Sequence, residues 1–239
     1  MMNIGNMSLN PEFQEAIFLN RPNRFLAEVE IHGRPVVVHV PNTGRCRELL
    51  LPMVPVLLEE GKGKGRKTLY SLHYVKNRGV WVNIHSVRAN DAAWMGLKDG
   101  KIMEIQDPQE IRREVTHGNS RIDLYCRSQG LEVYIEVKGV TLLDDETLVF
   151  PDAPTLRGVR HIQELSRLAE AGKRAIVLFV GQHPLGKSFR PNWEGDPLFA
   201  KTLAEAANRG VEVLCYAASP EAGRYNLAGK SLPCILLEG

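Results

Sequence analysis

Residues 120–142 read SRIDLYCRSQGLEVYIEVKGVTL, and they contain two short runs in which apolar and polar residues alternate. Alternation with a period of two is typical of β-strands that have one face in a core. Gln129-Gly130 separates the runs, and a two-residue loop there keeps apolar side chains opposite apolar ones, whereas a slip by one residue would mix the faces. We therefore predict a β-hairpin whose register places Asp123 directly opposite Glu136.

Two acids in this arrangement need a positive partner, because like charges directly opposite each other destabilise a sheet. A divalent cation between Asp123 and Glu136 would remove the conflict, and hard cations such as Mg²⁺ take carboxylate oxygens. Lys138 lies on the same face, where a cation orients an attacking water or stabilises charge on a phosphate. The pattern predicts Mg²⁺- or Mn²⁺-dependent phosphodiester hydrolysis. The alternative is a solvated hairpin face with Arg127–Glu132 and Lys138–Glu136 as ordinary surface pairs.

The N-terminal third of the chain is rich in short alternating runs. Residues 25–40 alternate on both sides of His32-Gly33-Arg34, which is a hairpin pattern. Further strands are expected at 53–60, 68–77 and 79–87. Several short strands at this spacing favour a small β-barrel of the oligonucleotide-binding (OB) type over residues 1–88.

From residue 89 onward the pattern changes to mixed helices and strands. Helical spacing is present at 93–105 and 107–115, where Asp107-Pro108 resembles a helix cap. After the hairpin come a helix, a continuously apolar strand, a second helix and a second apolar strand, at 155–172, 174–180, 196–210 and 211–218. This order predicts an α/β domain with a mixed sheet over residues 89–239, and an α+β protein overall.

Composition and charge are those of a cytoplasmic globular protein. The chain has 239 residues, 44% hydrophobic residues and a net charge of +2, which is too small to establish a polyanion partner. Its four cysteines are scattered without a CxxC pair, and its first residues lack the layout of a signal peptide. No apolar run approaches the ~20 residues of a membrane helix, so we expect no membrane partner.

Residues 181–188, GQHPLGKS, match the phosphate-binding pattern G-x-x-x-x-G-K-[ST]. That motif requires a helix that begins at its Lys-Ser pair, and Pro191 prevents a helix from running through the next residues. Pro184 also removes one of the N–H groups that would bind phosphate. We predict that this segment binds no nucleoside triphosphate.

Several longer segments resemble the sugar fermentation stimulation protein A family, and the resemblance covers nearly the whole chain. They are SRID (120–123), EVKGVTL (136–142), FPDAPTLRGVRHIQEL (150–165), RFLAEV (24–29) and HVPNTGR (39–45). Asp123 with Glu136-Val137-Lys138 is also similar to the PD-(D/E)xK nuclease motif. The resemblance implies DNA binding, an N-terminal OB-like barrel, a C-terminal PD-(D/E)xK nuclease-like domain and a regulatory link to sugar (maltose) metabolism.

The resemblance also implies roles for individual residues. Asp123 and Glu136 correspond to the metal-binding acids, and Lys138 to the motif lysine. Glu114, expected in a helix before the hairpin, matches an acid that such folds often use as a further metal ligand. The family's more usual Val and Asn are here Pro154 and Gly139, which affects loop geometry and removes no charged site residue.

Further site candidates follow from the position of their segments. Arg121, Asp152, Arg157 and His161 lie beside the hairpin acids or in the loop that enters the next helix, and Arg157 suits bidentate phosphate binding. The alternatives are a helix cap for Asp152 and a solvated cation for His161.

The expected nucleic-acid contacts are basic residues of the barrel. Arg24 and Arg45 are two of them, and the glycine-rich loop 61–67 adds Lys62, Lys64, Arg66 and Lys67. Such a loop neutralises phosphates without reading bases, although a flexible, solvated hairpin tip has the same composition. Two functions remain open at this point: a metal-dependent nuclease, and a DNA-binding regulator that does not cleave.

Overall fold

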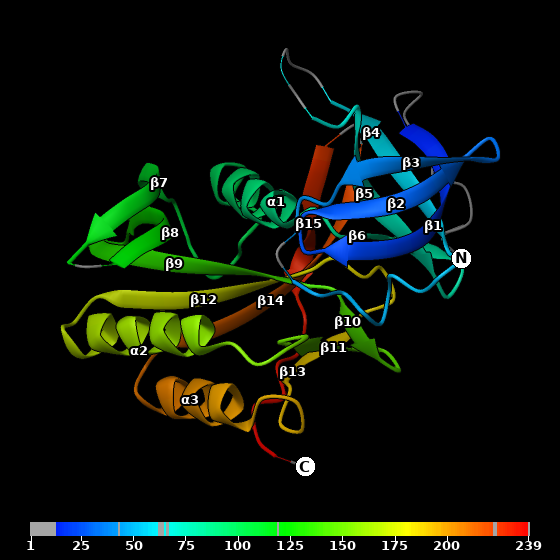
Figure 1. Cartoon of the computed structure of the whole chain (residues 1–239). Coiled ribbons are helices and arrows are strands. Elements are labelled where there is room, and N and C mark those ends of the chain that lie inside the picture. The colour runs from blue at the N-terminus through cyan, green and yellow to red at the C-terminus, as the bar shows by residue number, and fades with distance from the viewer. Residues whose placement is uncertain are drawn as a thin grey trace. The chain divides into compact units, whose positions relative to one another are not determined.

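The computed structural model describes residues 13–42, 44–61, 65, 67–118, 120–221 and 224–238, without the side chains of residues 221 and 224 (Figure 1). The described residues form two compact units, divided between Val87 and Arg88. Lys62, Lys64 and Arg66 of the predicted basic loop lie outside the described residues.

The first unit is a five-stranded β-barrel with one added strand. Its sheet has the order β3-β2-β1-β4-β5-β6, and a parallel pairing of β3 with β5 at His39 and Ser71 closes the barrel. The predicted OB-like barrel is therefore confirmed. The strands are β1 (Phe13–Asn23), β2 (Leu26–Ile31), β3 (Arg34–His39), β4 (Pro55–Glu60), β5 (Tyr70–Asn77) and β6 (Val80–Asn83).

The predicted hairpin at residues 25–40 is formed by β2 and β3. Its two-residue turn, His32-Gly33, has positive φ angles of 49° and 76°, as a type I′ turn requires. The alternating side chains of both strands point into a core that includes Ala27, Val29 and Val38. The hairpin therefore contributes one wall of the barrel.

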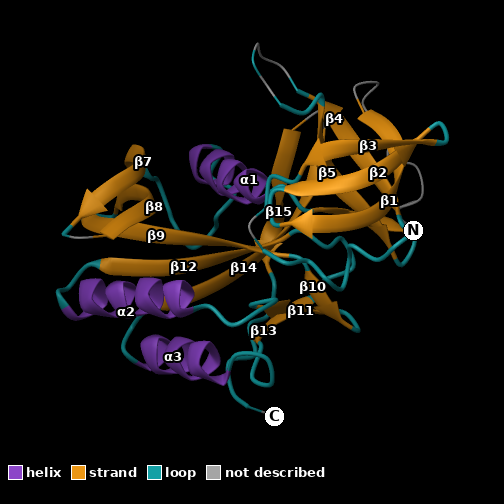
Figure 2. Ribbon diagram, viewed as in Figure 1, coloured by secondary structure: helices purple, strands orange, loops and turns teal. Residues whose placement is uncertain are grey.

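The second unit is built on a six-stranded mixed sheet with the order β15-β14-β12-β9-β8-β7 (Figure 2). The three central strands β9, β12 and β14 are parallel, and the strands outside them are antiparallel to their neighbours. The predicted mixed-sheet α/β domain is confirmed. The strands are β7 (Gln109–His117), β8 (Ser120–Ser128), β9 (Leu131–Val140), β12 (Arg174–Gly181), β14 (Glu212–Glu221) and β15 (Arg224–Ser231).

Helices cover both faces of this sheet. Helix α1 (Ser86–Lys98) lies on one face, and α2 (Leu156–Glu170) and α3 (Pro197–Asn208) lie on the other (Figure 2). Two buried apolar clusters fill the layers between helices and sheet. A small separate sheet, in the order β10-β11-β13, consists of β10 (Leu142–Asp144), β11 (Thr147–Phe150) and β13 (Ser188–Pro191).

The hairpin of residues 120–140 has the predicted register. Tyr125 pairs with Tyr134, and the turn is Gln129-Gly130, with φ angles of 51° and 79°. The ladder of β8 and β9 ends at the pair Leu124–Ile135. Its register thus brings the next residue of each strand, Asp123 and Glu136, to opposed positions.

One helix prediction before the hairpin is wrong, and another is correct only in its first half. Residues 107–115, expected as a capped helix, belong largely to strand β7, which pairs with β8. Positive φ angles at Glu110 and Glu114 interrupt the regular strand and hide its alternation. The helix expected at 93–105 ends at Lys98, shortly before Gly100, whose φ of 65° a helix does not accommodate.

The segment 181–188 is not followed by a helix. Strand β12 ends at Gly181, and strand β13 begins at Ser188, where a phosphate-binding loop would need a helix. Both glycines of the pattern face a buried leucine, since a Cβ on Gly181 or Gly186 would lie 2.4 or 2.5 Å from the Leu148 side chain. The two glycines therefore leave space for the buried Leu148 side chain.

None of the helices within the described ranges is long and apolar enough to cross a membrane.

Candidate active site and metal site

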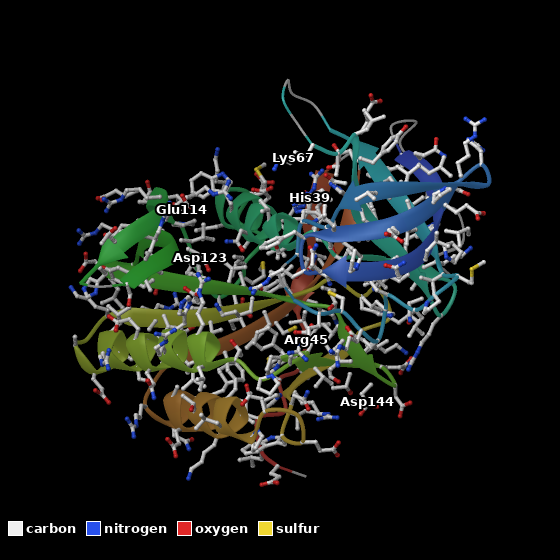
Figure 3. All side chains as sticks on the ribbon, viewed as in Figure 1. His39, Arg45, Lys67, Glu114, Asp123 and Asp144 are labelled. Atoms are coloured by element: carbon white, nitrogen blue, oxygen red, sulfur yellow. The ribbon has the colours of Figure 1, made fainter. Side chains whose placement is uncertain are left out.

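Three acids stand in a row across neighbouring strands of the mixed sheet. Between the pairs Arg113–Leu124 and Val115–Ile122, the register of β7 and β8 places Glu114 opposite Asp123. The β8–β9 hairpin places Asp123 opposite Glu136. Figure 3 labels Glu114 and Asp123, which come from β7 and β8. Glu114 is thus on a strand, not on the predicted helix, yet the strand brings it to the same site.

Asp123 is held by hydrogen bonds from two other elements. Its Oδ2 accepts the backbone N–H of Val137 at 2.8 Å, and its Oδ1 accepts the Asn90 amide of α1 at 3.0 Å. Burial raises the pKa of Asp123, and the neighbouring charge of Glu136 raises it further. Metal-free Asp123 is therefore in a position that disfavours its negative charge.

Glu136 is almost completely buried, with 2% of its surface exposed, and it has cationic neighbours. Its Oε1 lies 2.5 Å from Lys138 Nζ and is also in contact with His161 Nδ1. Burial acts to raise the pKa of Glu136, but the His161 hydrogen bond and the Lys138 charge outweigh it and lower that pKa. The predicted Lys138–Glu136 pair thus exists, but it is buried rather than solvated.

Helix α2 supplies the opposite wall of the site. Thr155 caps its first turn by accepting the Gly158 N–H at 3.0 Å. Arg157 and His161 are four residues apart and therefore on one face of the helix, with Arg157 Nε 3.4 Å from His161 Nε2. His161 Nδ1 lies 3.3 Å from Lys138 Nζ, which links the helix to the hairpin.

An open cavity of about 360 Å³ lies among these groups. Seven of the predicted site residues line it, namely Glu114, Arg121, Asp123, Glu136, Lys138, Arg157 and His161. Arg121 Nη2 and Glu114 Oε2 are 2.5 Å apart, and both side chains are more than 60% exposed. The cavity therefore has a buried anionic floor and a charged, solvent-facing rim.

The predicted site candidate Asp152 does not line the cavity.

Two residues that the sequence analysis did not single out help to organise this region. Asp196, which caps α3, also accepts the Thr155 N–H at 2.8 Å and so ties the start of α2 to α3. Asn90 positions Asp123 from α1. Neither contact has a short-range sequence signal, because each spans more than 30 residues.

The donor set can be compared with what a hard divalent cation requires. In the described part of the chain, no three His, Cys, Asp or Glu side chains are grouped so that they could hold a metal ion. Mg²⁺ is usually bound by one or two carboxylates together with several waters. Asp123 and Glu136 provide two opposed carboxylates, and burial together with the charge of Glu136 raises the pKa of Asp123, which a bound cation would counteract. The pair therefore fits Mg²⁺ or Mn²⁺.

The predicted basic residues Arg24, Arg45 and Lys67 are exposed on the barrel unit. Arg21 is partly buried and donates to four backbone carbonyls, including those of Arg24 and Arg45.

Fold and site together define a two-unit protein, with an OB-type barrel followed by a mixed-sheet domain that carries a carboxylate–lysine cluster of the PD-(D/E)xK pattern. Two family models match the chain in the same order. The N-terminal OB domain of SfsA matches residues 19–84, and the RE domain of the sugar fermentation stimulation protein matches residues 87–223. The chain belongs to the sugar fermentation stimulation protein (SfsA) family.

Curated relatives cover nearly the whole chain. A sugar fermentation stimulation protein homolog of Methanobrevibacter smithii is 47% identical over 231 residues, covering 92% of this chain and 97% of the relative. A homolog of Alkaliphilus oremlandii is 46% identical over 207 residues, covering 84% and 88%. Among solved structures, Pyrococcus furiosus SfsA in complex with Ca²⁺ has a TM-score of 0.85 and 32% identity, covering 96% of this chain and 98% of its own.

Proposed function

We propose that this protein binds DNA and hydrolyses phosphodiester bonds at the Asp123–Glu136–Lys138 site with a divalent metal ion. One observation carries the proposal: opposed carboxylates, a lysine and an arginine surround a single open cavity. This combination provides sites for a cation and for the phosphate that the cation would activate. Because the substrate would be intracellular nucleic acid, the proposal includes a cytoplasmic location.

The metal part of the proposal rests on the donor set and on a relative. Asp123 and Glu136 would hold Mg²⁺ or Mn²⁺, and Glu114 of β7, which is paired with Arg121, would become a further ligand only by turning towards them. The similar P. furiosus protein is described in complex with Ca²⁺, another hard cation that takes oxygen ligands. A bound Mg²⁺ or Mn²⁺ supplies an activated water and stabilises negative charge on the phosphate.

The other residues bind and orient the substrate. Lys138, already within 2.5 Å of Glu136, would hold the attacking water and stabilise charge that develops on the phosphate. Arg157, at the first turn of α2, would bind a phosphate oxygen through its planar guanidinium. His161 contacts Glu136, Lys138 and Arg157, and would fix their side chains relative to one another.

A second candidate is a largely non-specific DNA-binding regulator of sugar metabolism that does not cleave. It is favoured by the partners of Glu136, whose Oε1 is already in contact with both Lys138 and His161. A cation would have to compete with these contacts. In a regulator that does not cleave, the cluster of Glu136, Lys138 and His161 would stabilise the domain, and the barrel would provide the DNA-binding surface.

Cleavage and binding assays separate the two candidates. Plasmid DNA, linear duplex, single-stranded DNA and RNA are incubated with Mg²⁺ or Mn²⁺, and binding is measured separately in EDTA over a range of salt concentrations. A nuclease cuts only with metal, and Asp123→Ala or Lys138→Ala reduces cutting by at least about 100-fold while binding persists. Lys187→Ala, an exposed lysine paired with Glu146, is the control.

Intact substrates under all metal conditions, with binding present, would support the regulator. Absence of nucleic-acid binding at low salt would contradict both candidates, since phosphate contacts are strongest there.

A further inference from the structure

We propose that the barrel unit carries a stacking site for an unpaired nucleic-acid base, formed by the Phe25 ring with Arg24 and Arg45 beside it. The inference rests on the proposed nucleic-acid binding and specifies the ligand as a single-stranded segment. It concerns residues of the first unit only, and it adds an aromatic contact to the basic contacts predicted from the sequence.

Phe25 is an exposed aromatic residue on a fixed backbone. It lies with Arg24 in the two-residue turn between β1 and β2, and 53% of its surface is exposed. Its N–H donates to Asn23 Oδ1 at 2.9 Å, and its carbonyl accepts the Val40 N–H at 2.8 Å. The guanidinium of Arg24 lies 5.6 Å from the ring centroid, within cation–π range. The ring is therefore held in place at its base while much of it faces solvent.

Arg21 connects this turn to a second segment of the barrel. Its Nη2 donates to the carbonyls of Arg24 and Asn42 at 2.7 Å, and its Nη1 donates to those of Gly44 and Arg45 at 2.8 Å. One guanidinium group thus contacts the backbone at both Arg24 and Arg45. Two exposed arginines and one exposed aromatic ring consequently arise from adjacent, mutually bonded segments.

The second segment is itself anchored to the barrel. The Asn42 side chain donates to the Ile84 carbonyl at 2.7 Å and accepts the Gly44 N–H at 2.7 Å. Asn42 and Gly44 thus have backbone and side-chain contacts that need no ligand, and such preorganisation reduces the entropy lost on binding.

This chemistry matches an unpaired nucleotide better than duplex DNA. An aromatic face stacks on a base, and adjacent guanidinium groups neutralise phosphates, which is the usual combination in single-strand binding. Bases within a duplex are already stacked on their neighbours and do not offer a free face to Phe25. A single exposed apolar residue is common on protein surfaces, so a test must show that the ring contacts a base.

The test uses a fluorescein-labelled oligothymidylate of about 12 nucleotides. Its binding is followed by anisotropy in EDTA, beside a duplex and a strand of equal length that carries abasic sites. We expect Phe25→Ala to weaken binding of the oligothymidylate about tenfold, as loss of one stacked base predicts. Binding of the duplex and of the abasic strand should be unchanged, and Phe25→Trp should retain tight binding. Val37→Ala, which alters another exposed apolar residue of the barrel, is the control.

Each outcome has a definite meaning. Wild-type binding that Phe25→Ala leaves unchanged overturns the stacking site while DNA binding stands. An equal loss on the base-containing and abasic strands also overturns it, because the ring would then not act through a base. If the wild-type protein binds no nucleic acid at low salt, the proposed function fails, and the stacking site fails with it.

Discussion

Replacing Asp123 by Asn should stabilise the metal-free protein at neutral pH. Opposed side chains of an antiparallel pair are about 5 Å apart, and two unit charges at that distance repel by about 3 kcal/mol at an effective dielectric constant of 20. The contact of Lys138 with Glu136 offsets part of this repulsion. We therefore expect a net gain of about 1 kcal/mol in the free energy of unfolding, or about 2–4 °C in Tm.

The hydrogen bonds of Asp123 can survive this substitution. Asn retains one side-chain oxygen for the Val137 N–H, and Asn90 can rotate its amide so that its own oxygen accepts from the new NH₂ group. The variant thus removes the charge and leaves the shape and the two contacts in place.

The pH dependence has a definite sign. A carboxyl group whose pKa is raised by folding contributes stability that is complete below its unfolded pKa and is lost as the pH rises through its folded pKa. The pKa of Asp123 is raised, chiefly by burial and then by Glu136. The advantage of Asn should therefore be absent in acid and develop as the pH rises through the raised pKa of Asp123.

Metal should reverse the order of stability. Thermal and urea unfolding are measured in EDTA and in Mg²⁺ for the wild type, Asp123→Asn and the control Asp144→Asn, which alters an exposed acid paired with Arg190. Mg²⁺ at ten times its Kd stabilises the wild type by about 1.4 kcal/mol and should leave Asp123→Asn unchanged. An Asn variant no more stable than the wild type in EDTA, or one that Mg²⁺ stabilises equally, would refute the reasoning.

Two further substitutions test the core of the second unit. Glu104→Gln should lower the free energy of unfolding at neutral pH by about 1–2 kcal/mol, because the Glu104 carboxylate accepts hydrogen bonds from Tyr216 and Ser231. Burial acts to raise the pKa of Glu104, but these hydrogen bonds outweigh it and lower that pKa. In urea titrations the difference in stability between the wild type and Glu104→Gln should therefore disappear as the pH falls through the lowered pKa. Gly186→Ala should cost about 1–3 kcal/mol by displacing buried Leu148, and a variant as stable as the wild type in thermal unfolding would exclude that packing role.

Local alternation was sufficient to predict the hairpin that carries the site acids. The apolar positions of β8 and β9 face buried layers, so only one register keeps them together, and that register opposes Asp123 and Glu136. The turn residues Gln129 and Gly130 adopt the positive φ angles that a two-residue loop needs. A pattern that is both regular and enforced by burial can be recognised from sequence.

Other elements lacked such a pattern. Strand β7 contains two residues with positive φ, Glu110 and Glu114, and its side chains are mostly exposed, so no alternating apolar face was present. Strand β1, which includes Pro22, and strand β15 were not predicted either. Contacts such as His161 with Glu136 join residues 25 apart and depend on how α2 packs on the sheet.

The strands of the mixed sheet stand side by side in the order in which the ribosome makes them, from β7 through β8, β9, β12 and β14 to β15 (Figure 1). Each new strand can therefore join the edge left by the previous one, and no strand has to be inserted between two older neighbours. During synthesis, β9 remains an open edge until β12 follows about 30 residues later. We therefore expect Glu136 and Lys138 to be solvated in the nascent chain and to become buried only when the later half of the domain has been made.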